Sequence, residues 1–461
     1  MSKKPLAVVI LAAGKGTRMK SAPDKIIPKV LHKLAGRPMI GWLLDSVEKL
    51  DPEKIIVVIG PDMAELKEAV APHDTALQKI QDGTGGALKA ALPALKDFDG
   101  DLLVLLGDTP LVSIRTLKAL IAARNEDVQT GISVLGAEVI DPTGYGRLVI
   151  GKDKTLQKIV EEKDAGAKEK QIRIINAGAF CVDGEYLPGW LKQIGNQNAS
   201  GEYYVTDLPE IAAEEGIQTR VFITPSADEI RGCNSRADLA ALEQTLQNRL
   251  REEAMKSGVS MTDPSTVYLH FDTKLGKDVT LEPGVFFGPG VEIGDGVHIK
   301  AYSHIEGAVI SKNATIGPFA RIRPGTEIGA DVRIGNFVEI KKSKIGKRSK
   351  ISHLGYVGDT VMGDDTNFGC GAITVNYDGF EKHQTVIGKG VMVGSNVNLI
   401  APVEIDDGAF IAAGSTITEN VPADALSISR DTTKIREGWA REFRKRKEAV
   451  AKKLGKKNKA S

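Results

Sequence analysis

A glycine-rich basic segment follows the first apolar run of the chain, and its residue types suit the binding of phosphate. The segment Gly14-Lys15-Gly16-Thr17-Arg18 comes directly after residues 6–12. Backbone N–H groups of such a loop, with a helix start behind it, can surround phosphate oxygens. A Walker loop is excluded by the spacing, and a Rossmann loop is excluded because Met19 stands where it needs a third glycine.

Two further segments add a cation and a carboxylate. Pro28-Lys29-Val30 supplies a second lysine, and Asp108 directly follows an apolar run at 102–106. Ligands bind outside the carboxyl ends of strands in open α/β sheets. One carboxylate there suits Mg²⁺, which takes few protein ligands and keeps substrate phosphates as others. The alternative for Asp108 is a helix N-cap.

The elements that must position these residues alternate between strand and helix. Apolar runs predict strands at 6–12, 54–60, 102–106, 131–135 and 179–182, with helices at 41–50 and 64–71. This alternation predicts an α/β domain, Rossmann-like with a mainly parallel sheet, over residues 1–236.

A leucine stripe marks the next element. Leu239, Leu242, Leu246 and Leu250 are spaced three and four apart and predict a linker helix at 237–262, capped by Asn234 or Ser235. An ordinary helix packed on the first domain is the alternative.

A six-residue period occupies the second half of the chain. Aliphatic residues recur every six positions, at 316, 322, 328, 334 and 340 and again from 387 to 417. Hexapeptide repeats indicate a parallel β-helix, which we place in a domain at 263–435. A sandwich of short strands is the alternative, but it would not space single aliphatics so regularly. A turn-rich excursion at 376–380 interrupts the period, and such loops often carry function.

Composition narrows the class of protein. Lys plus Arg is 61 and Asp plus Glu is 60, so no overall charge argues for nucleic acid. No run approaches the roughly 20 apolar residues of a membrane span, and 1–13 lack a signal peptide pattern. Three separated cysteines suggest free thiols in the cytoplasm. We interpret the basic tail at 436–461 as a solvated, partly helical segment; nucleic-acid binding is its alternative.

These motifs together resemble a known family. The segments LAAGKGTRM at 11–19, PKVLH at 28–32 and GDTPL at 107–111 are similar to nucleotidyltransferases that make nucleoside-diphosphate sugars. GYGR at 144–147, IVEEKDA at 159–165, INAG at 175–178, GEYYVTD at 201–207 and the β-helix narrow the match. Outside the tail, the chain resembles the bacterial bifunctional N-acetylglucosamine-1-phosphate uridylyltransferases and glucosamine-1-phosphate acetyltransferases. The resemblance implies a left-handed β-helix and a homotrimer that shares active sites between chains.

The resemblance implies roles for the first site. Its expected UTP and UDP-sugar ligands are Leu11, Ala12, Ala13, Gly14, Lys29, Gln78, Gly83, Thr84, Gly146, Glu161, Asn176 and Asn234, with Arg18 and Lys29 catalytic and Asp108 and Asn234 on Mg²⁺. The chemistry agrees, because a sugar phosphate must attack the α-phosphorus of UTP and cations must offset the repulsion of two anions. Asn234 as a helix cap and Glu161 as a surface charge are the alternatives.

The second site is implied by HLGY at 353–356. Periodicity gives His353 no preference over His304 or His383, but the resemblance implies that His353 is the general base. Imidazole suits the removal of a proton from an amine that attacks a thioester. The implied substrate ligands are Arg323, Lys341, Tyr356 and Asn367, and those of acetyl-CoA are Cys370, Asn376, Tyr377, Ser395, Ala413 and Arg430. We expect Glu339 to orient His353. For Arg323 and Lys341, solvated surface charge is the alternative.

Four departures from the family pattern stand out. The loop between Met19 and Pro28 is longer than expected and brings Lys25 into competition with Lys29 for the phosphate. Gly86 replaces an expected histidine, Leu106 stands where some members have tyrosine, and Cys370 replaces an expected alanine. None of them removes a predicted metal ligand.

The sequence therefore predicts a bifunctional enzyme. Acetyl-CoA acetylates glucosamine 1-phosphate on the β-helix, and UTP then reacts with N-acetylglucosamine 1-phosphate in the first domain, giving UDP-N-acetylglucosamine for envelope polysaccharides and releasing pyrophosphate. Two alternatives remain open: nucleotidyl transfer to another sugar phosphate with the β-helix as an oligomerisation module, or a non-enzymatic scaffold of the same architecture.

Overall fold

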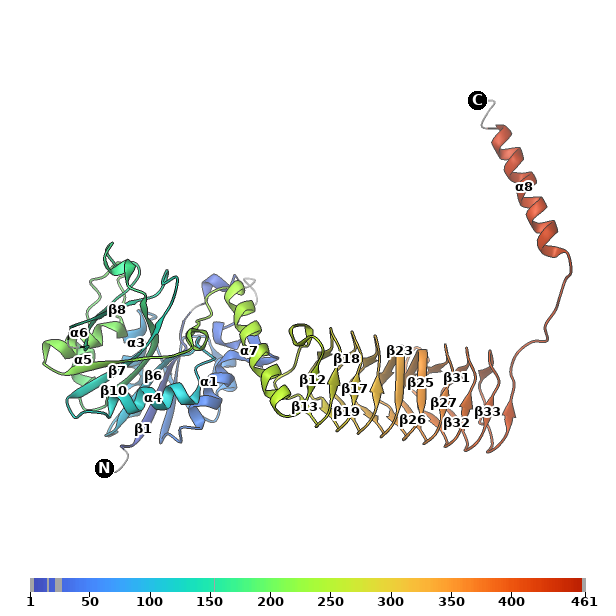
Figure 1. The fold of residues 1–461 in the computed structure, drawn as a ribbon, viewed down its shortest axis with the longest axis horizontal. Helices are drawn as coiled ribbons and strands as arrows, with labels where there is room; N and C mark the ends of the chain where they lie inside the picture. Colours follow the sequence, from blue (N-terminus) through green and yellow to red (C-terminus); the bar gives the residue numbers. More distant parts are fainter. Residues whose placement is uncertain (1–3, 15, 21–26, 153, 458–461) are drawn as a thin grey trace. The chain divides into compact units, whose positions relative to one another are not determined.

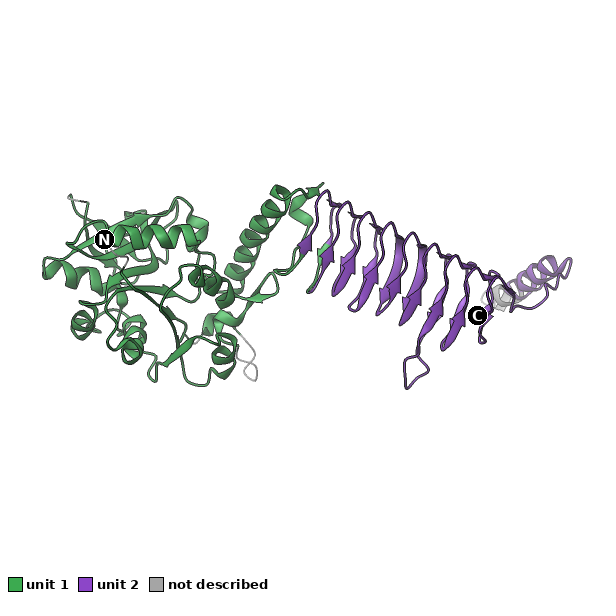
Figure 2. Cartoon of the chain, turned by 90° about the horizontal axis from the view of Figure 1, so that it is seen from below, with its two compact units in different colours: residues 1–273, 286–289 green, residues 274–285, 290–461 purple. Residues whose placement is uncertain are grey.

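The chain forms two compact units. The computed structural model describes residues 4–14, 16–20, 27–152 and 154–457. The first unit comprises the described residues up to Thr273 together with Phe286–Pro289, and the second comprises Lys274–Val285 and those from Gly290 onward (Figure 2).

The first unit is built on a twisted, mainly parallel sheet. Its strand order is β11 (Gln218–Ile223), β7 (Thr130–Glu138), β10 (Ile174–Asp183), β6 (Asp101–Leu106), β1 (Leu6–Leu11), β4 (Lys54–Ile59) and β5 (Asp74–Leu77). Strand β1 pairs in parallel with β4 and β6, whereas β10 runs antiparallel to its neighbours β6 and β7. Strands β8 (Arg147–Ile150) and β9 (Leu156–Val160) join at the edge of β10. The predicted α/β class is confirmed.

Helices cover both faces of this sheet. They are α1 (Met39–Glu48), α2 (Ala64–Ala69), α3 (Thr84–Ala91), α4 (Ile114–Arg124), α5 (Leu187–Gln193) and α6 (Leu208–Glu214) (Figure 1). Alternate residues of β1 enter different hydrophobic cores. Val8 packs in the cluster that contains Leu43 of α1. Val9 packs in the cluster that contains Leu88 of α3. Burial on both sides explains why the strands read as continuous apolar runs. A two-stranded ribbon, β2 (Lys33–Leu34) with β3 (Arg37–Pro38), precedes α1.

Helix α7 (Arg236–Lys256) packs within the first unit. Ser235 caps it, because its hydroxyl accepts a hydrogen bond from the Asp238 N–H at 3.2 Å and the Asp238 carboxylate accepts one from the Ser235 N–H at 2.8 Å. Leu242 and Leu246 are buried in a cluster with Met19. The compact units therefore divide near Thr273, and the helix expected as a linker at 237–262 belongs to the first of them.

The second unit is a parallel β-helix, the other part of the predicted fold. Its strands and the short β12 that precedes them are β12 (Ser260–Met261), β13 (Lys274–Leu275), β14 (Thr280–Leu281), β15 (Phe286–Phe287), β16 (Glu292–Ile293), β17 (His298–Ile299), β18 (His304–Ile305), β19 (Ala308–Ile310), β20 (Thr315–Ile316), β21 (Arg321–Ile322), β22 (Thr326–Ile328), β23 (Arg333–Lys341), β24 (Lys344–Ile345), β25 (Lys350–Gly358), β26 (Thr360–Met362), β27 (Asn367–Phe368), β28 (Ile373–Val375), β29 (Thr385–Ile387), β30 (Met392–Val393), β31 (Asn398–Ile400), β32 (Val403–Ile405), β33 (Phe410–Ile411), β34 (Thr416–Ile417) and β35 (Leu426–Ser427).

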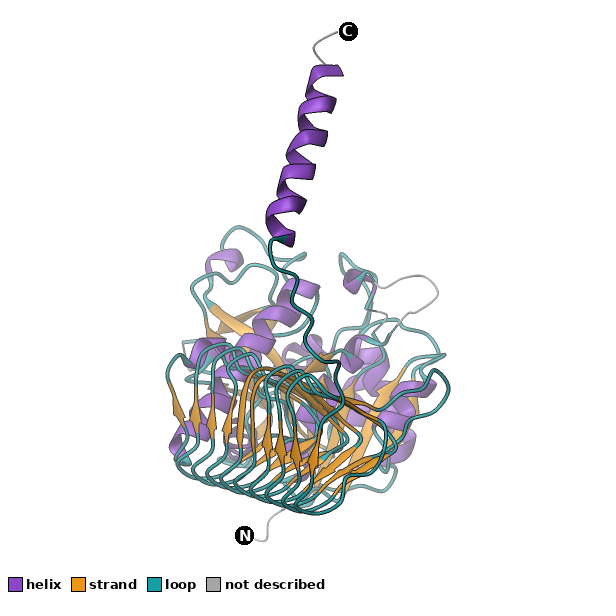
Figure 3. Cartoon of the chain, turned by 90° about the vertical axis from the view of Figure 1, so that its right-hand side faces the viewer, coloured by secondary structure: helices purple, strands orange, loops and turns teal. Residues whose placement is uncertain are grey.

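The six-residue period corresponds to the buried interior of this helix. Ile316, Ile334, Ile351 and Phe368 lie directly above one another in parallel register and are buried. Figure 3 shows the coils stacked one behind another, with strands along the sides and loops at the corners. Each aliphatic side chain therefore gains its contacts from the coils before and after its own.

One corner of the β-helix carries exposed residues in a left-handed backbone conformation. Tyr302, Phe319, Phe337 and Leu354 have φ values of 58°, 55°, 56° and 44°. The rings of Tyr302 and Phe319 stack at 5.3 Å between centroids, as do those of Phe319 and Phe337. This stacking offsets part of the cost of a positive φ at a non-glycine residue. The chain direction changes at this corner, so side chains before the corner and side chains after it project from different faces of the β-helix.

The C-terminal segment ends in helix α8 (Trp439–Lys457). Residues 429–452 are all exposed, which agrees with the solvated helix expected for the tail. None of the helices in the described ranges is both long and apolar enough to cross a membrane.

Candidate active sites

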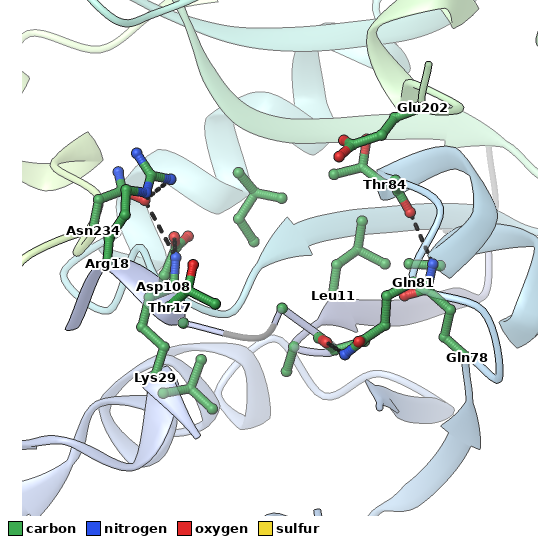
Figure 4. Close-up of a pocket in the computed structure, with 18 residues that line it drawn as sticks. Leu11, Thr17, Arg18, Lys29, Gln78, Gln81, Thr84, Asp108, Glu202 and Asn234 are labelled. Carbon is green, nitrogen blue, oxygen red and sulfur yellow. Dashed lines mark hydrogen bonds and ion pairs between the residues drawn. The ribbon is translucent and has the colours of Figure 1, made fainter. Parts of the chain in front are cut away.

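A pocket of about 570 Å³ opens at the carboxyl ends of β1 and β6 in the first unit. Its walls include eleven residues that the sequence singled out: Leu11, Ala12, Ala13, Gly14, Arg18, Lys29, Gln78, Gly83, Thr84, Asp108 and Asn234. Figure 4 shows Arg18, Lys29, Asp108 and Asn234 gathered on one side of Leu11, and Gln78, Gln81, Thr84 and Glu202 on the other. The pocket is therefore polar at both ends.

The first end holds two cationic side chains and two side chains whose oxygen atoms can bind a cation. Lys29 forms an ion pair with Asp108, and its Nζ lies 3.4 Å from Asn234 Oδ1. Arg18 donates a hydrogen bond to the same amide oxygen at 2.8 Å. The Cys233 N–H donates to the Asp108 carbonyl at 3.0 Å, which ties the segment before α7 to the end of β6. A sequence-remote asparagine is thereby brought beside the carboxylate.

These two oxygens fit the expected magnesium ion. A single cationic group, the Lys29 ammonium, contacts both the Asp108 carboxylate and Asn234 Oδ1, so both lie within reach of one cation. Among the described residues no group of three or more His, Cys, Asp or Glu side chains is placed to hold a metal. One carboxylate and one amide oxygen nevertheless suit Mg²⁺, which keeps phosphate and water oxygens as its other ligands.

The glycine loop packs against Lys29. Gly16 has a φ of 62°, and a β-carbon built there would lie 3.1 Å from the Lys29 β-carbon. Lys29 begins a short 3₁₀ segment, Lys29–Leu31, that directs its side chain to Asp108. The competing Lys25 and the loop residue Lys15 lie outside the described residues.

The second end of the pocket is formed around the start of α3. The Gln78 side chain is buried, and its Nε2 donates to Asp82 Oδ1 at 3.1 Å and to the Gly83 carbonyl at 3.0 Å. Thr84 Oγ1 accepts a hydrogen bond from the Val205 N–H at 3.0 Å. Gly83 needs to be glycine, because its φ is 114° and a β-carbon would lie 2.4 Å from the Tyr203 carbonyl oxygen.

Sequence reasoning missed two polar residues at this end. Gln81 donates its side-chain amide to the Ala13 carbonyl, and Glu202 lines the pocket. Gln81 lies three positions after Gln78, and this closeness in sequence to a predicted uracil ligand could have indicated it. Glu202 lies in the segment GEYYVTD that supported the family resemblance, but no role was assigned to it, because only the fold brings its loop back to α3.

The three residues expected to contact the sugar form a group of their own. The Asn176 N–H donates to the Gly146 carbonyl at 2.8 Å, and a β-carbon on Gly146 would lie 3.4 Å from Glu161 Oε1. Thr206 donates its hydroxyl to Glu161 at 3.1 Å, and burial raises the pKa of Glu161. Glu161 directly follows β9, Asn176 lies in β10 and Gly146 directly precedes β8; none of the three is part of the pocket wall.

On the β-helix, the expected acetyl-CoA residues form a column at one corner. Asn336 and His353 are partners in the register of β23 and β25. Cys370, Ser395 and Ala413 occupy the equivalent positions of the next three coils, two residues after the buried Phe368, Val393 and Ile411. Arg430 donates to the Ala413 carbonyl at 2.6 Å. Residues far apart in sequence therefore share one edge.

His353 faces solvent at the head of this column. The backbone turns at Leu354, and His353 is exposed whereas Ile351 is buried. Its Nδ1 lies 3.0 Å from Asn336 Oδ1. Because an amide oxygen only accepts hydrogen bonds, this contact favours the tautomer with the proton on Nδ1, which leaves the Nε2 lone pair available to accept a proton. Asn336 was not predicted from sequence.

The expectation that Glu339 orients His353 is wrong. Glu339 instead accepts a hydrogen bond from Arg323 at 2.7 Å, and it lies 3.9 Å from Arg321. The physical reason is the corner: Glu339 and His353 lie on different sides of it, and Glu339 pairs in register with Tyr356. The residue that contacts the imidazole is Asn336.

The expected phosphate ligands occupy the adjoining side. Arg323 and Lys341 follow the register partners Ile322 and Ile340 on neighbouring coils. The Lys382 ammonium beside Lys341 lowers the Lys341 pKa. Two cations held together attract an anion such as phosphate. Lys382, two residues after the excursion, is a further candidate that sequence reasoning missed.

The remaining predicted residues divide between this side and the excursion. Asn376 is buried, hydrogen-bonded to Asp359, and its Nδ2 lies 3.5 Å from the Tyr356 hydroxyl. It therefore lies with the phosphate ligands and not in the column. Tyr377 is exposed and donates to the Gly379 carbonyl at 2.6 Å, and Asn367 donates to Met392 Sδ at 3.2 Å on the face before the corner.

Family models match both units. A model of the MobA-like NTP transferase domain matches residues 8–171. A model of the bacterial transferase hexapeptide (six repeats) matches 272–307 and 384–419, and one of the GMPPB C-terminal domain matches 304–401. The first match contains most of the pocket, and the last contains His353.

Curated relatives match the chain over almost its whole length. The bifunctional protein GlmU of Zymomonas mobilis is 48% identical over 448 residues, which cover 96% of this chain and 98% of the relative. The bifunctional protein GlmU of Paramagnetospirillum magneticum is 46% identical over 444 residues, with the same shares covered. That of Thermoanaerobacter pseudethanolicus is 44% identical over 456 residues, covering 95% and 98%.

Proposed function

Because this chain belongs to the family of the bifunctional protein GlmU, we propose that it makes UDP-N-acetylglucosamine in two reactions, one in each unit. The observation that carries the proposal is the pocket in which Lys29, Asp108 and Asn234 meet beside the glycine loop. The product serves cell-wall synthesis, in which peptidoglycan and lipopolysaccharide require the sugar.

In the first unit the phosphate of N-acetylglucosamine 1-phosphate attacks the α-phosphorus of UTP. No side-chain nucleophile is required, because the substrate oxygen forms the new bond and pyrophosphate leaves. Arg18, Lys29 and the backbone N–H groups of the glycine loop offset the charge that develops on the leaving group. Gln78, Gly83 and Thr84 bind the uracil at the other end of the pocket, and Gly146, Glu161 and Asn176 bind the sugar.

Asp108 and Asn234 would be the protein ligands of Mg²⁺. The ion would supply positive charge that neutralises part of the charge of the substrate phosphates. The ammonium of Lys29 contacts both oxygens. The Lys29 ammonium, which lies beside the glycine loop, would add a second cation that reduces repulsion between the two anionic reactants.

In the second unit glucosamine 1-phosphate is acetylated. Arg323, Lys341 and Lys382 hold its phosphate, and Tyr356, Asn367 and Asn376 surround the sugar. The Nε2 atom of His353 takes the proton as the amine attacks the thioester carbon, and coenzyme A leaves as the thiolate. The column formed by Cys370, Ser395, Ala413 and Arg430, together with Tyr377, binds acetyl-CoA.

The assembly and compartment follow from the same proposal. The described residues at the corner and in the excursion leave Tyr377 and Arg430 facing solvent. A homotrimer in which β-helices lie side by side would cover them and complete each acetyl-transfer site with a neighbouring chain. We place the enzyme in the cytoplasm, where UTP and acetyl-CoA are available and thiols such as Cys370 stay reduced.

The test supplies glucosamine 1-phosphate, acetyl-CoA, UTP and Mg²⁺ and follows thiol and pyrophosphate release separately. We expect both signals, with pyrophosphate release dependent on prior acetylation. Pyrophosphate from ready-made N-acetylglucosamine 1-phosphate without thiol release would leave the β-helix as an oligomerisation module. Release of neither product would refute the enzyme and favour a scaffold.

A further inference from the structure

An unusual pair of residues lies behind Gln78 at the uracil end of the pocket. Asp82 occupies the space that a side chain at position 86 would need, since a β-carbon built on Gly86 would lie 1.8 Å from Asp82 Oδ1. Gly86 lies in the first turn of α3 and is buried. The glycine therefore makes room for the aspartate, and the two residues act as a unit.

Asp82 fixes the orientation of the Gln78 amide. Gln78 Nε2 donates to Asp82 Oδ1 at 3.1 Å and to the Gly83 carbonyl at 3.0 Å, and both partners only accept. Both amide protons are thereby used inside the protein. Gln78 lines the pocket whereas Asp82 does not. The pocket is offered only the amide oxygen of Gln78.

We propose that Asp82 is a positioning residue that sets the preference for uracil over cytosine. The inference rests on the proposed uridylyl transfer. Uracil carries an N–H at its N3 position, which can donate to the Gln78 oxygen. Cytosine has a lone pair at N3, which would face that oxygen and be repelled. An amide free to rotate would offer its NH₂ group to cytosine instead, so the preference depends on what prevents rotation.

Asp82 Oδ1 is one of the two acceptors that prevent rotation of the Gln78 amide. If Asp82 becomes leucine, only the Gly83 carbonyl opposes rotation, and a flipped amide loses one hydrogen bond where it previously lost two. One hydrogen bond is worth about tenfold in an equilibrium. Asp82→Asn keeps an acceptor oxygen at the same place. Gly86→Ala displaces the Asp82 carboxylate by direct contact and should mimic its loss.

The experiment uses the full chain and measures kcat/KM for UTP and for CTP with N-acetylglucosamine 1-phosphate. In Asp82→Leu and in Gly86→Ala the ratio of kcat/KM for UTP to kcat/KM for CTP should fall about tenfold. In Asp82→Asn this ratio should stay within about twofold of the unaltered protein. Adding Gly86→Ala to Asp82→Leu should change the ratio little further, because both remove the same contact. Gly189→Ala, in α5 with nothing within 4 Å of the new carbon, is the matched control.

The readout separates positioning from folding. Gly86→Ala gains helix propensity but forces the Asp82 carboxylate to move, because the new β-carbon would lie 1.8 Å from Asp82 Oδ1. A purely structural role therefore predicts a changed melting temperature with an unchanged ratio. An unchanged ratio in Asp82→Leu, or an equal fall in Gly189→Ala, would overturn the proposal. If the unaltered protein releases no pyrophosphate from UTP, the proposed function fails with it; if it does and the ratio stays constant, only the role of Asp82 fails.

Discussion

Replacement of Asn336 by alanine should slow acetyl transfer without disturbing uridylyl transfer. Within the described residues, the His353 ring contacts the Asn336 side-chain oxygen, which lies 3.0 Å from Nδ1. That bond favours the tautomer with the proton on Nδ1 and the lone pair on Nε2. Without it the ring can rotate and exchange tautomers, so a smaller fraction of the enzyme holds Nε2 ready to accept the proton of the amine.

The size of the effect follows from the exposure of the pair. A hydrogen bond contributes about 0.5–1.5 kcal/mol net, which corresponds to about a two- to thirteenfold change in rate. His353 is exposed and Asn336 is half-buried, so water replaces part of the lost bond. We therefore expect kcat to fall about three- to fivefold, with KM for both substrates nearly unchanged.

The assay follows thiol release from acetyl-CoA with glucosamine 1-phosphate. Asn336→Asp keeps an acceptor oxygen and should lose less activity than Asn336→Ala. Pyrophosphate release from UTP and ready-made N-acetylglucosamine 1-phosphate reports that the first unit is intact. The reasoning would be refuted if Asn336→Ala retained full kcat, or if the loss appeared only in KM.

Four further outcomes are expected. Asp108→Ala should reduce pyrophosphate release at least a hundredfold while thiol release stays at its original rate; an equal loss of both would point to misfolding. Chelation of divalent cations should likewise stop only pyrophosphate release, restored by added Mg²⁺. Arg430→Ala should raise KM for acetyl-CoA severalfold, because the residue ends the column at Ala413; titration calorimetry with coenzyme A checks this. Burial, with Glu210 nearby, raises the pKa of Asp207 from 3.8 to about 6. The extra proton affinity of the folded state favours folding fully below pH about 4 and no longer above about 6. Asp207→Asn should therefore stabilise the first unit by about 1 kcal/mol at pH 8, a value already reduced for solvent screening, and should not stabilise it at pH 4. Denaturant melts at both pH values will show this.

The fold followed closely from periodicity because each pattern has one dominant physical cause. The hexapeptide aliphatics fill the interior of the β-helix, and Ile316, Ile334 and Ile351 are buried as expected. The strand at Leu6–Leu11 also followed from local composition, and of the two caps that the sequence offered, Asn234 and Ser235, the structure has Ser235. The boundary at Thr273 did not, because leucines on α7 indicate that one face is buried but not which domain buries it.

The first site was easier to assemble from sequence than the second. Residues such as Lys29 and Asp108 lie beside strand ends, and all parallel strands end on one edge of the sheet. At the second site the direction of each side chain depends on the corner at Leu354, where a positive φ breaks simple alternation. Asn336 and Lys382 were missed for this reason, since contacts between coils are invisible in a linear period.

The stacked coils impose a reading frame on the chain that resembles the frame of a coding sequence. Register partners Ile334 and Ile351, Ile351 and Phe368, and Val393 and Ile411 are seventeen or eighteen residues apart, whereas Phe368 and Val393 are twenty-five apart. The extra residues lie between Val375 and Thr385, the segment that includes the excursion and Lys382. One residue inserted within a strand would turn core residues outward and displace His353 from Cys370, while a whole loop inserted at a corner leaves both in phase. Length variation among such proteins should therefore be concentrated at corners.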